Sequence, residues 1–185
     1  MRELEGLSSL ESLTIGGMFV TDAGLEGLRK LPQLRDLTVS GTCITDAGLA
    51  HVERLGNLRT LSLAHTGITG AGLKHLKELK QLESLDLDYT GVDDTDLAYL
   101  SGLENLRFLY LGGPQLDGSG LLHLKDLKNL EIVYFVGSPV KTEYIDQFRQ
   151  VQTGSTEVLR FKRLPLSAPK VKLRPMTQPA VDDTM

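Results

Sequence analysis

The chain repeats itself with a period of 24 residues, and this period constrains its fold more than any other feature. The phrases VTDAGL, ITDAGL and ITGAGL occupy residues 20–25, 44–49 and 68–73. Aligning the chain on these phrases brings six apolar residues into one frame: Val20, Ile44, Ile68, Val92, Leu116 and Val140. Leucines precede them in the same frame, as in the unit with Leu55, Leu58, Leu61 and Leu63. No unit of this length can bury such a leucine face alone, so successive units must stack.

Each unit combines the period of a strand with that of a helix. The segment LRTLSL at 58–63 ends in the alternation of apolar and polar residues that is typical of a short strand. The segment TDAGLAHVERL at 45–55 predicts a short helix, in which Thr45 is a suitable N-cap and Asp46 favours the positive helix start. Leu49, Val52 and Leu55 form its apolar stripe. We therefore predict an α/β solenoid shaped as a curved horseshoe, with a parallel sheet on the concave face and short helices on the convex face.

Over residues 4–160 these units resemble the repeats of leucine-rich repeat proteins. The ITDAGL phrase and the 24-residue length are similar to bacterial arrays of this family and to the cysteine-containing subclass found behind F-box domains. Many members carry an asparagine or cysteine that bonds the turn backbone, whereas this chain has Thr42, Thr66 and Thr90, then Pro114 and Ser138. We see no F-box ahead of the repeats, so a ubiquitin-ligase role is not carried over. The resemblance implies a leucine-rich repeat solenoid that binds other proteins.

Composition and charge exclude several classes of protein. The 185 residues are 41% hydrophobic and 24% charged, as in ordinary globular proteins. They contain no apolar run of transmembrane length and no secretory signal, so we expect a cytoplasmic protein that does not bind membranes. The single cysteine, Cys43, excludes an internal disulfide. Residues 160–185 carry a net charge of +4 and residues 1–159 one of −8, so most of the surface would repel nucleic acid.

The two ends of the chain differ from the repeats. The array is expected to cover residues 1–161 in about six units. Its last part, 141–161, reads as a C-terminal cap, with Ile145, Phe148 and Val151 on one helix face and a final strand in EVLRF. Residues 162–185 form a proline-rich basic tail that we expect to be disordered. The first unit has no polar cap, which favours a longer array or a loose first turn over the core edge.

In such a sheet, the neighbours of the inward leucines form columns on the concave surface. The first three strands present small polar residues in these columns. From the fourth strand onward the columns hold carboxylates and aromatic rings, and aromatic side chains are frequent anchors of protein interfaces. We predict a partner-binding patch made of His65, Asp86, Asp88, Tyr89, Phe108, Tyr110, Ile132 and Tyr134. The carboxylates favour a protein or peptide with basic groups.

Two other interpretations of this patch stay open. In the first, Phe108 and Ile132 pack on each other or under the C-terminal segment and need no partner. In the second, the basic tail folds back over Asp86 and Asp88, which makes the contact intramolecular.

Several residues that suggest chemistry are better explained by repetition. His51, His75 and His123 share one helix column, but Tyr99 interrupts the column and no carboxylate column adjoins it, so we predict no metal site. The glycine-rich segment 111–122 lacks the order of a phosphate-binding loop and fits the repeat frame. There is no nucleophile elbow, and an exposed sheet offers no water-excluding pocket. We therefore predict no catalytic residue, no cofactor and no enzymatic activity.

These observations favour a non-enzymatic protein–protein interaction module, acting as a monomer through the C-terminal half of the concave face. One alternative is a structural or spacer segment of a larger multidomain protein. Another is the substrate-recognition part of a ligase-like complex. Neither nucleic acid nor membrane is an expected partner.

Overall fold

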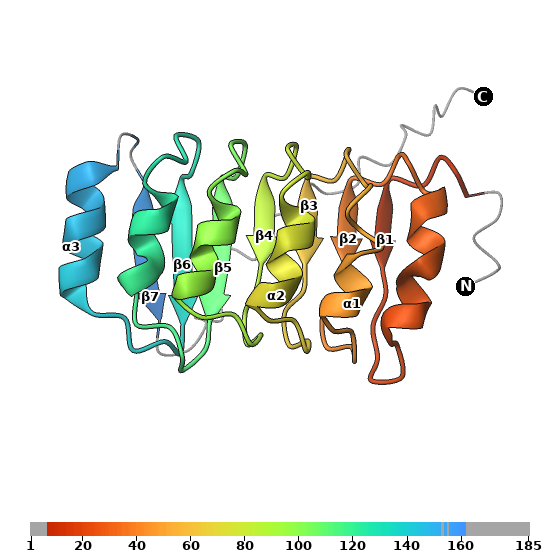
Figure 1. Ribbon diagram of the computed structural model, residues 1–185, viewed down its shortest axis with the longest axis horizontal. Helices are drawn as coiled ribbons and strands as arrows, with labels where there is room; N and C mark the ends of the chain where they lie inside the picture. Colours follow the sequence, from red (N-terminus) through yellow and green to blue (C-terminus); the bar gives the residue numbers. More distant parts are fainter. Residues whose placement is uncertain (1–6, 153, 155, 162–185) are drawn as a thin grey trace, which may run out of the picture.

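The computed structural model describes residues 7–152, 154 and 156–161, drawn in colour in Figure 1. These residues form one parallel sheet of seven strands, in which each strand pairs with the next along the chain. The strands are β1 (Ser12–Thr14), β2 (Asp36–Thr38), β3 (Thr60–Ser62), β4 (Ser84–Asp86), β5 (Phe108–Gly112), β6 (Ile132–Val136) and β7 (Glu157–Phe161). The sheet stays open because β1 and β7 lie at opposite ends. The predicted α/β solenoid with a parallel sheet is confirmed.

Short helices connect the strands and cover one face of the sheet, the near face in Figure 1. They are η2 (Asp22–Lys30), α1 (Asp46–Leu49), α2 (Gly70–Leu73), η3 (Lys74–Leu76), η4 (Thr95–Leu100), η5 (Ser119–Leu124) and α3 (Thr142–Val151). The helix predicted over 45–55 is α-helical only as far as Leu49 and continues as turns. A connection that must return to the next strand within one unit has room for little more than a turn, and 3-10 geometry is common in such short pieces.

One row of apolar side chains runs through the interior from the first strand to the last. Its members are register neighbours in the sheet: Leu13, Leu37, Leu61, Leu85, Leu109, Val133 and Val158. The four leucines from Leu37 to Leu109 are completely buried. Full burial of one leucine side chain contributes about 1.5–3 kcal/mol. The prediction that leucines of successive units share a single core is confirmed.

In the first two copies of the repeated phrase, the aspartate joins its coil to the next. The backbone N–H and the hydroxyl of Thr45 donate to the two carboxylate oxygens of Asp22, each over 2.7 Å. Thr69 donates to Asp46 in the same way, over 2.8 and 2.7 Å. Thr45 occupies the predicted N-cap position but makes no side-chain cap hydrogen bond. Its hydroxyl donates to the carboxylate of the preceding coil instead.

A stronger version of this contact lies farther along the array. Asp94 is only 8% exposed, and its carboxylate accepts hydrogen bonds from three backbone N–H groups of the next coil. The donors are Asp117 at 2.7 Å, Gly118 at 3.0 Å and Gly120 at 2.9 Å. Gly120 is required here, because a Cβ at this position would meet the backbone of Asp94. Hydrogen bonds between coils therefore add to the shared apolar core.

The threonines that replace the family's turn residue satisfy the turn themselves. The hydroxyls of Thr42, Thr66 and Thr90 each donate to the carbonyl oxygen three residues earlier. All three side chains are buried. A threonine therefore performs the backbone-bonding role that the resemblance assigns to asparagine or cysteine.

The last unit departs from the repeat. Helix α3 buries Ile145 and Phe148 against the end of the core, and β7 adds a strand beside β6. Val151, predicted on the same face, is instead 48% exposed, because it is the final residue of the helix. The array boundary at residue 161 stays a prediction, and the tail of residues 162–185 lies outside the described part of the chain.

Candidate functional site

The predicted columns lie on the open face of the sheet, opposite the helices. In the first column Phe108 on β5 adjoins Ile132 on β6. In the second, Asp86 on β4 adjoins Tyr110 on β5, which in turn adjoins Tyr134 on β6. The structure therefore brings these five patch residues together on three consecutive strands.

Two of the tyrosines form a parallel stack. The rings of Tyr110 and Tyr134 are 4.7 Å apart between centroids and only 5° from parallel. The expectation that Tyr134 is exposed is wrong, since it is 4% exposed, whereas Tyr110 is half-buried. The stack covers one side of Tyr134, and β7 places Leu159 beside it on the other. Burial raises the pKa of both phenols, so both stay protonated at neutral pH.

Asp86 is held in place by two hydrogen bonds. The hydroxyl of Ser62 on β3 donates to Oδ2 over 2.8 Å, and the backbone N–H of Asp88 donates to Oδ1 over 3.0 Å. Burial raises the pKa of Asp86 above its ordinary value, although these two hydrogen bonds and the neighbouring His65 oppose the rise. Ser62 was not singled out from the sequence, although the repeat places it one unit before Asp86 on the adjacent strand.

Asp88 is the most unusual group on this face. It was predicted as part of the partner-binding patch, and only 7% of it is exposed. Gly112 on the adjacent strand leaves the room it fills, since a Cβ there would lie 2.8 Å from Oδ1 of Asp88. Within the described residues Oδ1 has no hydrogen-bond partner. Burial first, and then the charge of Asp86, raises the pKa of Asp88 to about 7, partly offset by the N–H of Gly112.

The fourth column consists of the residues at the turn that follows each strand. Two of these residues depart from the pattern of the others. Glycines hold this position with positive φ in four coils: Gly17, Gly41, Gly113 and Gly137. His65 and Tyr89 take the same left-handed conformation, with φ of 55° and 52°. Their rings stack with centroids 4.9 Å apart and planes 8° from parallel. Both are exposed, and the Tyr89 hydroxyl reaches over Gly137, where a Cβ would lie 2.7 Å from it.

Phe108 and Ile132 are half-buried register neighbours, which agrees with the interpretation that they pack on each other. The guanidinium carbon of Arg107 lies 5.1 Å from the centre of the Phe108 ring. This contact was not foreseen from the sequence. Phe108 therefore has partners within the chain, and it is less available to a second molecule than Tyr89.

Charges are distributed unevenly on this face. Just before the strands, Arg59, Glu83, Arg107 and Glu131 form a chain of ion pairs with distances of 2.6–3.9 Å. The columns of β3 to β6 contain no lysine or arginine. Among the described residues, neither Asp86 nor Asp88 has an ion-pair partner. The centre of the patch is therefore acidic and uncompensated.

The histidines of the helix column do not form a cluster. Nδ1 of His75 lies 3.1 Å from a carboxylate oxygen of Glu53. The described part of the chain contains no group of three or more His, Cys, Asp or Glu side chains placed to hold a metal ion. Nor does it contain a helix that is long and apolar enough to cross a membrane.

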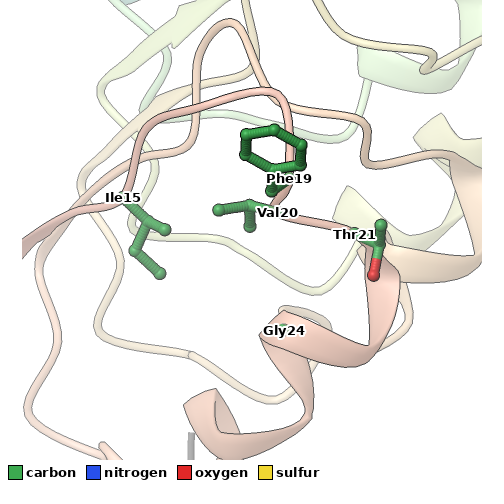
Figure 2. A pocket seen from close by; sticks show the side chains of 5 residues that line it. All are labelled: Ile15, Phe19, Val20, Thr21 and Gly24. Atoms are coloured by element: carbon green, nitrogen blue, oxygen red, sulfur yellow. The ribbon is translucent and has the colours of Figure 1, made fainter.

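A second exposed surface lies at the N-terminal end of the array. Met18 is 76% exposed and Phe19 98% exposed. Figure 2 shows the Phe19 ring next to Val20 at a mostly apolar pocket, lined by Ile15, Phe19, Val20, Thr21 and Gly24. No titratable side chain lines this pocket.

Comparison with known proteins agrees with the fold. A family model described as "Leucine rich repeat" matches residues 56–116. The structure is similar to an internalin C2 of Listeria monocytogenes, at 27% identity and a TM-score of 0.60, over 71% of this chain and 54% of that one. It shares its fold with an internalin, InlF, of the same organism, at 20% identity and a TM-score of 0.60, over 85% of this chain and 49% of that one.

The chain spans about half the length of these two internalins. No curated protein matches the sequence. The bacterial and cysteine-containing subclasses suggested by the 24-residue unit remain a prediction. The stacked leucine row, the open parallel sheet and the family match over residues 56–116 lead to one conclusion: the chain contains leucine-rich repeats.

Proposed function

We propose that the protein is a non-enzymatic module that binds a protein or peptide through its concave face, in the C-terminal half of the sheet. The leucine-rich repeat fold and the similarity to internalins support a protein-interaction module in general. The patch composition supports the choice of surface. Apart from Asp36, β1 to β3 present small polar side chains, whereas β4 to β6 present aromatic rings and carboxylates, and aromatic rings dominate interface energetics.

The observation that carries the proposal is the stacked pair of His65 and Tyr89. A left-handed backbone costs a residue with a Cβ roughly 1–2 kcal/mol, and four other coils avoid this cost with glycine. The chain accepts this cost in two successive coils, at His65 and Tyr89, and the two rings form an exposed aromatic platform. Strained backbone of this kind is concentrated at functional sites, where the surrounding structure over-determines it.

The experiment is affinity capture from the native lysate with the intact chain immobilised. Tyr89→Gly should abolish or strongly reduce recovery of the partner, because it removes the platform and restores the residue that the turn prefers. Tyr99→Ala is the matched control, since Tyr99 is a comparably exposed tyrosine on the helix side. Equal recovery by Tyr89→Gly and the intact chain would refute the concave patch.

A structural segment of a larger protein is the second candidate. The apolar surface around Phe19 favours it, because an exposed phenylalanine at the end of a stack suits packing against another structural unit. Loss of partner recovery on Phe19→Ser, with normal recovery on Tyr89→Gly, would favour this candidate over the patch. The ligase-like role, the monomeric state and the cytoplasmic location remain predictions.

A further inference from the structure

We propose that Asp86 and Asp88, together with the aromatic stacks on either side of them, form a receptor for one cationic side chain of the partner, an arginine or a lysine. This inference rests on the proposed function and names the chemistry by which the patch selects its partner.

Each carboxylate neighbours one of the two aromatic stacks, either in strand register or along the chain. Asp86 adjoins Tyr110 in register, and Tyr110 stacks on Tyr134. Two residues farther along the same strand direction, Asp88 directly precedes Tyr89, which stacks on His65. Two carboxyl groups on one strand are therefore accompanied by aromatic rings on the adjacent strand and at the following turn, so a cation bound here would gain ion pairing and cation–π attraction together.

The carboxylates are prepared for a positive charge that the chain itself does not supply within the described residues. Oδ1 of Asp88 is buried without a hydrogen-bond partner within the described residues, which disfavours its ionised form, and a positive charge held beside Asp88 would favour that form. Ser62 holds Asp86 in position through one oxygen and the Asp88 N–H through the other. Each carboxylate oxygen can accept a further bond, so Asp86 keeps capacity for an external donor.

The same face already shows the expected contact once within the chain. The Arg107 guanidinium lies over the Phe108 ring at 5.1 Å and is bound to Glu131 over 2.6 Å. This is one cation held by an aromatic face and a carboxylate, at the edge of the patch. The Asp86 and Tyr110 pair, one strand pair away, presents a carboxylate and a ring without such a cation.

Charge complementarity also selects the sign of the ligand. Residues 1–159 carry a net charge of −8, and the columns of β3 to β6 hold no lysine or arginine. An anionic or neutral apolar side chain would leave the buried carboxylates uncompensated, and the anionic one would add repulsion. A guanidinium or an ammonium group compensates them.

The test is a titration of the full-length, 15N-labelled chain, followed by NMR, with the acetylated and amidated peptide Gly-Gly-Arg-Gly-Gly. Matched peptides carry lysine or citrulline in place of arginine; citrulline has nearly the shape of arginine and no charge. We expect saturable shifts of the amides of Asp86, Tyr89 and Tyr110 with the arginine and lysine peptides, and at least tenfold weaker binding with citrulline. Equal binding of the arginine and citrulline peptides would overturn the proposal.

Two variants locate the site. Asp86→Asn removes one charge with little change of shape and should weaken binding of the arginine peptide at least tenfold. Asp126→Asn, at an exposed carboxylate remote from this face, should leave the affinity unchanged. A well-dispersed spectrum establishes that each variant is folded. If Asp86→Asn is not folded, Tyr89→Ala, which leaves both carboxylates in place, must show the same loss for the proposal to stand. Equal weakening by Asp86→Asn and Asp126→Asn would mean nonspecific attraction and would refute the site.

The chain's own tail is the competing occupant. In a full-length variant the tail residues Lys162, Arg163, Lys170, Lys172 and Arg174 are replaced by glutamine. Shifts at Asp86 and Tyr110 in this variant without any peptide would identify the tail as the occupant and overturn the assignment to a partner. If Tyr89→Gly loses the lysate partner while the arginine and citrulline peptides bind alike, the proposed function stands and the cation receptor fails.

Discussion

Replacing Asp88 with asparagine should stabilise the protein at alkaline pH and leave its stability near pH 4 almost unchanged. Burial and the charge of Asp86 raise the pKa of Asp88 from its ordinary value of 3.8 to about 7. The folded chain therefore keeps a proton on Asp88 that the unfolded chain has already lost, and stability falls as pH rises from about 4 to about 7. At about 1.4 kcal/mol per pKa unit, the loss has an upper limit of about 4 kcal/mol.

The assay is urea unfolding of both proteins at pH 4.5 and pH 8. Asparagine cannot ionise, so the advantage of the variant should grow by about 2–4 kcal/mol between the two pH values. Asp86, on the same face, has a raised pKa of its own and contributes a pH dependence to both proteins. Asp126→Asn, at an exposed site, is the control and should show no such growth. A constant difference between Asp88→Asn and the parent at both pH values would refute the reasoning.

Three further variants test the scaffold by the free energy of unfolding. Leu61→Ala, in the middle of the completely buried row, should cost about 3–5 kcal/mol, whereas Leu122→Ala, at a 40% exposed side chain, should cost less than about 1 kcal/mol; similar values would contradict a shared core. Asp94→Ala should cost about 3 kcal/mol, because three backbone N–H groups of the next coil lose their acceptor, and a loss below about 1 kcal/mol would exclude this role. Tyr89→Gly should change stability by no more than about 1 kcal/mol, since relief of positive φ offsets the lost stack, while Tyr110→Gly within β5 should cost at least about 2 kcal/mol; the reverse order would contradict the strain argument.

The 24-residue period was sufficient to predict the sheet and its register. A constant period leaves one way to stack leucines of successive units, so Leu37, Leu61, Leu85 and Leu109 had to become neighbours. The columns of outward residues follow from the alternation of a strand, and for this reason Asp86 and Tyr110 could be paired from the sequence.

The burial of individual side chains within the columns could not be predicted from any local sequence pattern. Asp88 and Tyr134 alternate outward like their neighbours, yet both are buried. The cause lies in adjacent strands, because Gly112 leaves space for Asp88 and β7 brings Leu159 beside Tyr134. A periodic pattern states which way a side chain points and not what covers it.

The hydrogen bonds of the repeated phrase also depend partly on the sequence and partly on the tertiary structure. The sequence by itself determined that an aspartate stands at the start of the first two helices, and a helix-dipole role was the local interpretation for Asp46. Only the tertiary structure decided that Asp22 and Asp46 bind the next coil. Each aspartate accepts hydrogen bonds from a threonine 23 residues later, and the two meet only when the coils stack. Likewise, the sequence alone shows His65 and Tyr89 at positions that hold glycine in other coils. Their left-handed backbone and their parallel rings are seen only in the tertiary structure, where the two coils lie side by side.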